Sequence, residues 1–202
     1  MNAVRESFGD IDIYLFDQLL KGRFDHCKTV LDVGCGKGRN LVYFLKNGFD
    51  VYGIDANPAA IRAVRELASA LNPQIPSEHF ITGVAEHLPY GRNFFDLIIC
   101  NAVLHFSRDQ HHFDQMLNAI WNVLKPGGYL FVRLASSIGI ETLIRDAGNG
   151  TWLLPDGSER FLVDEQTLLE YTDKLNGILY EPIKTTNVQN LRCMTTWCLQ
   201  KK

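Results

Sequence analysis

Two short segments of this sequence carry residue types that could hold a nucleoside. Residues 30–40 (VLDVGCGKGRN) contain three glycines at alternate positions, and Asp32 stands two residues before the first of them. Residues 51–55 (VYGID) form an apolar run that ends in the carboxylate Asp55. Glycines let a backbone approach a ligand closely, and a carboxylate accepts two hydrogen bonds from ribose hydroxyls. The spacing therefore predicts a strand, a glycine turn that opens a helix, and a second strand, which together bind a nucleoside.

The glycine spacing decides which nucleoside is favoured. A dinucleotide fingerprint, G-x-G-x-x-G, that starts at Gly34 would have its third glycine at position 39, which is Arg39. The chain has G-x-G-x-G instead. An NAD(P)-dependent oxidoreductase is therefore the less favoured interpretation.

The G-x-G-x-G turn resembles the first motif of class I S-adenosylmethionine-dependent methyltransferases. Four later segments are similar to that family's motifs and follow in the same order: Asp55, residues 83–90 (GVAEHLPY), residues 94–101 (FFDLIICN) and residues 124–130 (LKPGGYL). The overall pattern resembles the small bacterial methyltransferases of the tellurite-resistance and type 11 groups. The resemblance implies S-adenosyl-L-methionine as the cofactor and S-adenosyl-L-homocysteine as its product.

The resemblance also implies a cofactor site assembled from these motifs. Asp32 would orient the amino group of the cofactor or hydrogen-bond the turn backbone, Asp55 would hold the ribose, and the turn amides and the helix N-terminus would face the methionine end. Many relatives have an aspartate where this chain has Val84, so the adenine amine would bond to Glu86, water or a backbone carbonyl. The predicted cofactor-binding residues are Asp32, Gly34, Cys35, Gly36, Asp55, Ala56, Ala85, Glu86 and Asn101.

Three side chains are candidates for catalysis and substrate binding. His105 lies four residues after Asn101, where it could take a proton from an attacking nucleophile or merely cap or pack at a junction. Arg133 interrupts an apolar strand and could bind an acidic substrate group or reach outward to solvent. We also expect Tyr14 to face the substrate. No metal site is predicted, because the adjacent His111 and His112 diverge on a helix.

The predicted function is in-line SN2 transfer of a methyl group to an oxygen, nitrogen or sulfur atom of a small molecule. Positioning alone can supply effective molarities of about 10⁵ M and upward, so no dedicated catalytic residue is required. The alternative outside catalysis is a cofactor-binding module that serves as a partner or sensor subunit.

Composition agrees with one folded domain. Of the 202 residues, 46% are hydrophobic and 21% charged, and the net charge of −3 comes without a cluster of basic residues. This balance favours a small-molecule substrate over nucleic acid. The five cysteines form no C-x-x-C pair, no signal peptide is evident and no apolar run approaches 18 residues, so we expect a cytoplasmic protein that does not bind membranes.

Alternating strand and helix patterns predict an α/β fold, a Rossmann-like sheet of seven mostly parallel strands with helices on both faces. Asn57-Pro58 and Asp164 are predicted to begin helices. Residues 178–184 and 191–199 are predicted to be a C-terminal antiparallel hairpin. The single domain, 1–202, then comprises a helical lid (1–27), the cofactor-binding core (28–135), a substrate-cap insertion (136–163), and the last helix with the hairpin (164–202).

Overall fold

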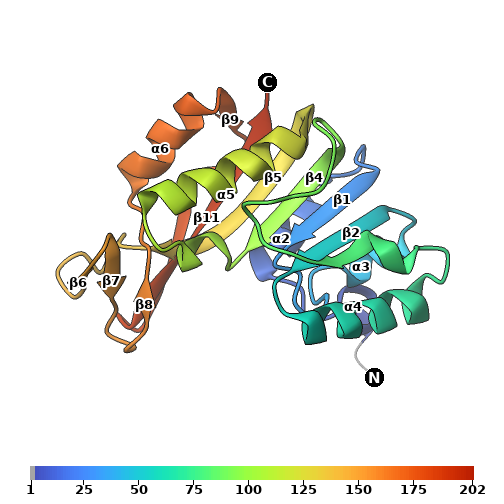
Figure 1. Cartoon of the computed structure of the whole chain (residues 1–202), viewed down its shortest axis with the longest axis horizontal. Helices are drawn as coiled ribbons and strands as arrows, with labels where there is room; N and C mark the ends of the chain where they lie inside the picture. The colour runs from blue at the N-terminus through green and yellow to red at the C-terminus, as the bar shows by residue number, and fades with distance from the viewer. Residues whose placement is uncertain (1–2) are drawn as a thin grey trace.

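The protein is built on one eight-stranded sheet, seen in a computed structural model that describes residues 3–202 (Figure 1). Seven strands follow the order β10-β11-β5-β4-β1-β2-β3, and β9 pairs with β11 beside β10. The strands are β1 (Thr29–Val33), β2 (Asp50–Asp55), β3 (Phe80–Thr82), β4 (Phe95–Asn101), β5 (Leu124–Ser136), β9 (Gly177–Leu179), β10 (Lys184–Val188) and β11 (Arg192–Lys201). The first five strands pair parallel, and β11 runs antiparallel to its neighbours. The predicted mixed sheet is confirmed.

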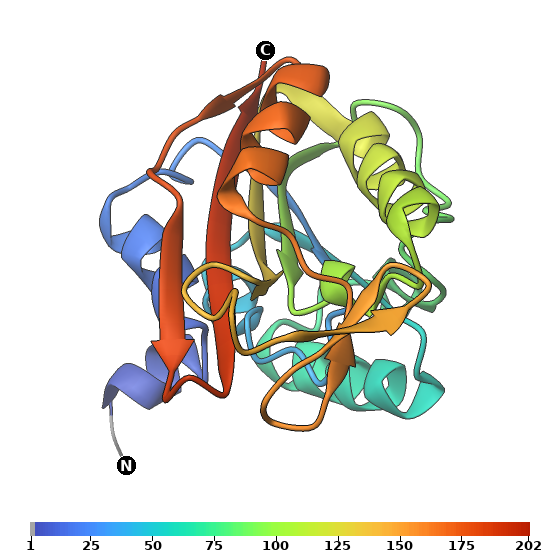
Figure 2. The same cartoon turned by 90° about the vertical axis from the view of Figure 1, so that its left-hand side faces the viewer.

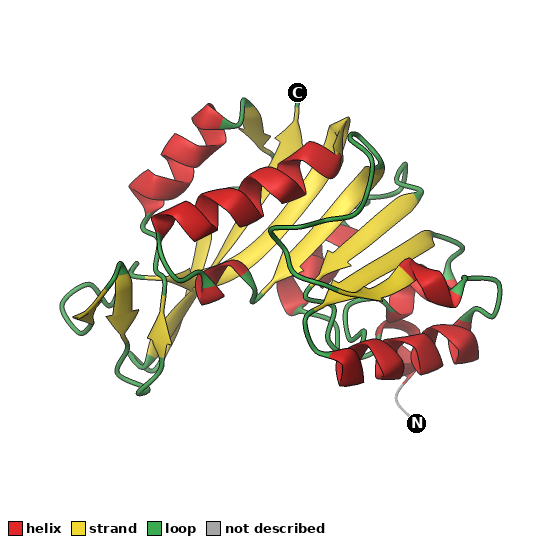
Figure 3. Cartoon of the chain, viewed as in Figure 1, coloured by secondary structure: helices red, strands yellow, loops and turns green. Residues whose placement is uncertain are grey.

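Helices cover both faces of this sheet (Figures 2 and 3). One face packs against α5 (Gln110–Val123) and α6 (Glu165–Lys174), and the other against α2 (Ile13–Leu20), α3 (Val42–Lys46) and α4 (Pro58–Leu71). Successive strand residues point to opposite faces, so Leu31 belongs to the first core and Val30 to the second. The remaining helical segments are α1 (Ala3–Phe8), η1 (Ser77–His79) and η2 (Leu104–Phe106). None of the described helices is both long and apolar enough to cross a membrane.

The helix starts follow the predicted capping chemistry. Asn57 accepts a hydrogen bond from the Ala59 N–H ahead of α4, with Pro58 in the first helical position. The Asp164 side chain likewise accepts a hydrogen bond from the Thr167 N–H at the start of α6. A side-chain oxygen at this position satisfies one of the amides that a helix start leaves free.

The C-terminal hairpin forms as an antiparallel pair, but the predicted bounds of its first strand are wrong. Residues 178–184 are not one strand, because β9 ends at Leu179 and β10 begins at Lys184. Pro182 lies between them and has no N–H to donate to a sheet ladder. Both pieces pair with β11, so a single predicted strand becomes two short ones.

The predicted cap, residues 136–163, contains a sheet of its own. Strands β6 (Arg145–Gly148), β7 (Thr151–Leu153) and β8 (Glu159–Arg160) form a three-stranded antiparallel sheet. It projects beyond the carboxyl end of β5, at the lower left of Figure 1. A small apolar cluster that includes Ile140, Leu154 and Cys193 joins it to the main sheet.

The N-terminal segment, predicted to be a lid, also contributes side chains to the hydrophobic core. Leu15 of α2 and Phe24 are fully buried in the core beneath the sheet. Its link to the strand ends is made by Asp12, whose backbone N–H donates to Asn40 and whose carboxylate pairs with Arg133. The first two residues of the predicted lid lie outside the described part. The described part is therefore a core element that also approaches the strand ends.

Candidate functional site

The glycine turn after β1 is shaped by a close contact from β4. Gly34 has a φ of +72°, a region that residues with a side chain rarely adopt, and a Cβ there would overlap the Val103 side chain. The Gly34 and Cys35 amides both donate to the Ile54 carbonyl, at 2.8 and 3.1 Å. Glycine at position 34 thus lets the ends of β1, β2 and β4 come together.

The Gly34 and Cys35 amides donate to the Ile54 carbonyl and the Gly36 amide donates to Asp55. These three amides are therefore engaged within the turn, and the predicted role of the turn amides toward a cofactor stays a prediction. The turn also does not open a helix directly, since α3 is five residues long and begins only at Val42. The Cys35 side chain is buried, and this burial raises the pKa of its thiol.

Asp55 holds the turn and the next helix start together. Its Oδ2 accepts from the Gly36 N–H and its Oδ1 from the Asn57 N–H, both at 2.8 Å. Each carboxylate oxygen can accept a second hydrogen bond. Asp55 can therefore still receive two ribose hydroxyls while it fixes the backbone around them.

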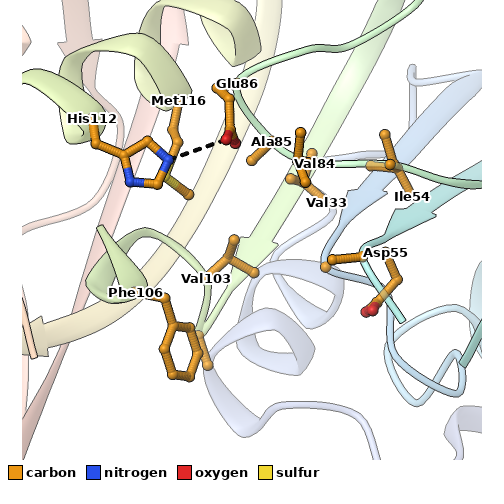
Figure 4. Close-up of a pocket in the computed structure, with 14 residues that line it drawn as sticks. Val33, Ile54, Asp55, Val84, Ala85, Glu86, Val103, Phe106, His112 and Met116 are labelled. Atoms are coloured by element: carbon orange, nitrogen blue, oxygen red, sulfur yellow. Dashed lines mark ion pairs between the residues drawn. The ribbon is translucent and has the colours of Figure 1, made fainter. Parts of the chain in front are cut away.

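A cavity of about 390 Å³ opens beside Asp55. Five of the predicted cofactor residues line it: Gly34, Asp55, Ala56, Ala85 and Glu86. Figure 4 shows the Asp55 and Glu86 carboxylates well apart, with Val84, Ala85 and Val103 among the apolar side chains of the pocket. An apolar slot with a few polar groups at its rim suits a flat heterocycle joined to a sugar.

The predicted cofactor-binding residues do not include nine of the fourteen that line this cavity, among them Val103, Phe106, His112 and Met116. His112 Nε2 lies 3.2 Å from Glu86 Oε1, and its Nδ1 accepts from the Arg108 N–H. Helix α5 thereby places an imidazole beside the carboxylate expected near the adenine, although His112 Nε2 makes no hydrogen bond within the described residues. In the sequence, Asp109 could have been recognised as the N-cap of this helix, which would have placed His112 in its first turn.

Asp32 and Asn101 do not line this first cavity but lie on adjacent strands beside it. Asp32 of β1 is in register with Ile99 of β4, and Asn101 ends β4 two residues later. Both side chains are buried, and within the described residues none of their oxygen and nitrogen atoms has a partner. Burial raises the pKa of Asp32 to about 8, an effect that nearby Arg39 opposes.

Buried polar groups without partners are costly, which indicates that a ligand supplies the missing bonds. A carboxylate beside an amide fits the ammonium and carboxylate ends of an amino acid. The residues present therefore fit the methionine portion of S-adenosylmethionine, with the adenosine portion in the apolar cavity.

A second cavity of about 240 Å³ meets the first at Ala102, which lines both. Ala102 has a φ of +63°, and its N–H donates to the Arg133 carbonyl at 2.7 Å. A left-handed conformation costs a non-glycine residue roughly 1–2 kcal/mol, and such strain clusters at functional sites. The second cavity brings together three predicted site residues, Asn101, His105 and Arg133.

His105 is placed as a hydrogen-bond donor. Its Nδ1 accepts from the Ala135 N–H at 3.1 Å, so the neutral ring carries its proton on Nε2. Burial, and then the charges of Arg160 and Arg192, lower the pKa of His105 to about 4. This arrangement disfavours His105 as a general base near neutral pH, and a catalytic role for it stays a prediction.

Arg133 and Tyr14, the two predicted substrate residues, contact each other. Arg133 Nη1 lies 2.9 Å from Asp12 Oδ2, and its guanidinium lies 5.1 Å from the centre of the Tyr14 ring. The Tyr14 hydroxyl bonds to Thr186 of β10. Arg133 lines the second cavity, whereas Tyr14 packs against Arg133 and supports it.

The sequence profile of a family described as "Methyltransferase domain" matches residues 31–132, half of the chain. The chain belongs to this methyltransferase family. Membership confirms the family predicted from the glycine turn and the four later motifs.

Known proteins similar to this methyltransferase include an uncharacterized methyltransferase of Synechocystis, 34% identical over 101 residues, which cover 50% of this chain and 44% of the relative. A tRNA U34 carboxymethyltransferase of Idiomarina loihiensis is 31% identical over 140 residues, covering 65% and 42%. The chain thus spans less than half the length of these relatives. The fold is similar to that of a 1,6-didemethyltoxoflavin-N1-methyltransferase from Burkholderia thailandensis, solved with S-adenosylhomocysteine bound (TM-score 0.72, 19% identity, 99% of this chain and 81% of that one).

The first prediction concerns Asp55 of the methyltransferase. Replacing it by alanine should weaken S-adenosylhomocysteine binding by about 2 kcal/mol, roughly 30-fold, because charge-assisted hydrogen bonds contribute about 1.5–3 kcal/mol each. Calorimetric titration measures the change. Since Asp55 also holds the Gly36 and Asn57 amides, the unfolding temperature of each cofactor-free variant is the control. Unchanged affinity in a folded Asp55→Ala variant would refute the assignment.

The second prediction concerns Asp32 and pH. Because the folded-state pKa is raised to about 8 from an ordinary value near 4, the folded protein binds an extra proton between those values. The stability of the cofactor-free methyltransferase should therefore fall, through this group, as pH rises from about 4 to 8. Asp32→Asn, which is neutral and of equal size, should remove that contribution. Denaturant unfolding at pH 5 and pH 8 tests this, and parallel pH profiles for the two proteins would contradict it.

Proposed function

We propose that this protein transfers the methyl group of S-adenosylmethionine to a small-molecule acceptor. The observation that carries the proposal is the junction at Ala102, where an apolar cavity beside Asp55 meets a polar cavity lined by Asn101 and His105. A cofactor bound across the first cavity and an acceptor in the second would meet at that junction.

The bound cofactor supplies an already activated methyl group. Asp55 would accept the ribose hydroxyls, and Asp32 with Asn101 would supply partners for the amino-acid end. Glu86, which lies beside His112, or a backbone carbonyl would accept from the adenine amine, since the Val84 side chain offers no acceptor. Val103 and Phe106 line the first cavity, in which Ala102 marks the junction.

Transfer then depends on the orientation of the acceptor. An oxygen, nitrogen or sulfur nucleophile would attack the methyl carbon in line with its bond to sulfur, and as that bond breaks its electron pair would stay on the sulfur. Effective molarities of about 10⁵ M and upward from such positioning lessen the need for a base. A neutral His105 with its proton on Nε2 donates a hydrogen bond to the acceptor and orients it, and any acceptor proton leaves to water.

Two other functions remain as alternatives to this proposal. The placement of Asp32 and Asn101 on adjacent strands would serve equally well a module that binds the cofactor without catalysis. An NAD(P)-dependent oxidoreductase is disfavoured by family membership and by Arg39, which stands where the third fingerprint glycine would be. An acceptor in RNA is a distinct outcome, since one relative is named a tRNA carboxymethyltransferase.

The third prediction tests the proposal directly. Purified protein is incubated with methyl-labelled S-adenosylmethionine and, separately, with the small-molecule and RNA fractions of a cell extract. We expect label to enter a small molecule, and Asp55→Ala to reduce the rate by tenfold or more at limiting cofactor. Calorimetric S-adenosylhomocysteine binding without transfer to any fraction would favour the non-catalytic module. Transfer to RNA alone would overturn the small-molecule acceptor.

A further inference from the structure

The second cavity concentrates positive charge in a chain whose net charge is −3. Four of the chain's 20 lysines and arginines line it, and they come from distant parts of the sequence: Arg39 after β1, Arg133 in β5, Arg160 in β8 and Arg192 in β11. The main sheet and the small sheet of the cap thus each contribute arginines to one space of about 240 Å³. That is the volume of roughly eight water molecules.

The carboxylates paired with these arginines do not balance their charge. The Asp12 Oδ2 atom lies 2.9 Å from Arg133 Nη1 and 4.0 Å from Arg39 Nη2. Asp156 lies 3.8 Å from Arg192 and also accepts from the Ser158 N–H and hydroxyl. Four guanidinium groups therefore face two carboxylates.

Arg160 makes no ion pair within 4.0 Å among the described residues, although, after the Ser158 hydrogen bonds and the charge of Arg192, its own charge helps to lower the pKa of Asp156. Its Nη1 donates to the Glu159 carbonyl, and its guanidinium lies 4.8 Å from the centre of the Phe106 ring. The neighbouring Glu159 side chain accepts from the Thr151 hydroxyl instead. The charge of Arg160 is therefore available to a ligand beside Phe106, which lines the cofactor cavity.

Unused hydrogen-bonding groups converge on the same space. Asn101, which is 7% exposed, lines the cavity with both polar atoms of its amide unpartnered within the described residues. The Arg133 Nε–H is buried and likewise unpartnered there. The neutral His105 adds a donor at Nε2. The unused donors at Arg133 Nε and His105 Nε2, together with the guanidinium groups around them, form a site for an anion next to Asn101.

We infer that the acceptor is a small organic anion whose carboxylate or phosphate group is held by Arg133, Arg160 and Arg192. This inference rests on the proposed function, since it names the substrate class of that site. Guanidinium groups bind both kinds of anion through paired N–H donors. With its charged group at the arginines, the acceptor presents its nucleophile toward Asn101 and Ala102, where the two cavities meet.

The test uses the full chain saturated with S-adenosylhomocysteine, titrated with inorganic phosphate and, separately, with malonate at constant ionic strength. A ligand that binds only the folded state raises the unfolding temperature in a saturable way. We expect such binding for at least one probe, and the tighter probe assigns phosphate or carboxylate. Arg160→Gln combined with Arg192→Gln should weaken it tenfold or more. Arg145→Gln, an exposed arginine on the same small sheet, is the matched control and should leave it unchanged.

Absence of saturable binding in the unsubstituted protein, or equal binding in the double variant, would overturn the inference. The affinity for S-adenosylhomocysteine is measured on the same samples. If the cofactor fails to bind, the proposed function fails, and the titration of cofactor-free protein still decides whether the anion site exists.

A second arm identifies the acceptor class. The small-molecule extract is divided by anion exchange before incubation with labelled cofactor. Label in the anionic fraction, with a KM raised at least tenfold in the double variant, supports the inference. Label in the neutral or cationic fraction, or in RNA, contradicts it.

Discussion

The site depends on the burial of two unpartnered polar side chains, Asp32 and Asn101, where the strand order of the sheet reverses. β1 lies between β2 and β4, so the chain leaves it toward one side of the sheet and later returns on the other. In open α/β sheets this reversal leaves a crevice at the carboxyl ends of the strands. Desolvation there holds Asp32 in its protonated form, with a pKa of about 8, until a cation replaces the lost hydration.

The two cavities that meet at Ala102 differ in the side chains that line them. That difference suits each cavity to a different ligand. The first is bounded by apolar side chains with Asp55 and Glu86 among them, which suits a nucleoside of known shape. The second is bounded by guanidinium groups and amide donors, which recognise charge. The strained turn at Ala102 keeps Val103 close above Gly34 and separates the two environments by a single residue.

Five residues of the first cavity were predictable from the sequence because each belongs to a local motif. Gly34, Asp55, Ala85 and Glu86 each follow a strand within a short motif, and the structure brings them to one cavity. The helix caps at Asn57 and Asp164 were predictable for the same reason, since capping involves residues two or three apart.

The acceptor half could not be predicted in this way. Arg39, Arg160 and Arg192 meet only through the docking of the small sheet on the main one, and no periodic pattern encodes that contact. His112 and Met116 both lie on α5 and line the first cavity, but the hydrophobic pattern of that helix indicates only which side packs against the core, so it does not identify them as cavity residues. The first strand of the last hairpin is divided into β9 and β10 around Pro182, although the rest of residues 178–184 has the pattern of a single strand.

Counting the protons released when S-adenosylhomocysteine binds tests the central claim most directly. The count comes from calorimetric titration at pH 7 in buffers of different ionisation enthalpy. If Asp32 is protonated when buried alone and ionises to receive the ammonium group of the ligand, binding should release about one proton. The Asp32→Asn variant should release none. Binding without proton release in the unsubstituted protein would contradict the account, because the orphaned carboxyl would then not be the partner of the ligand.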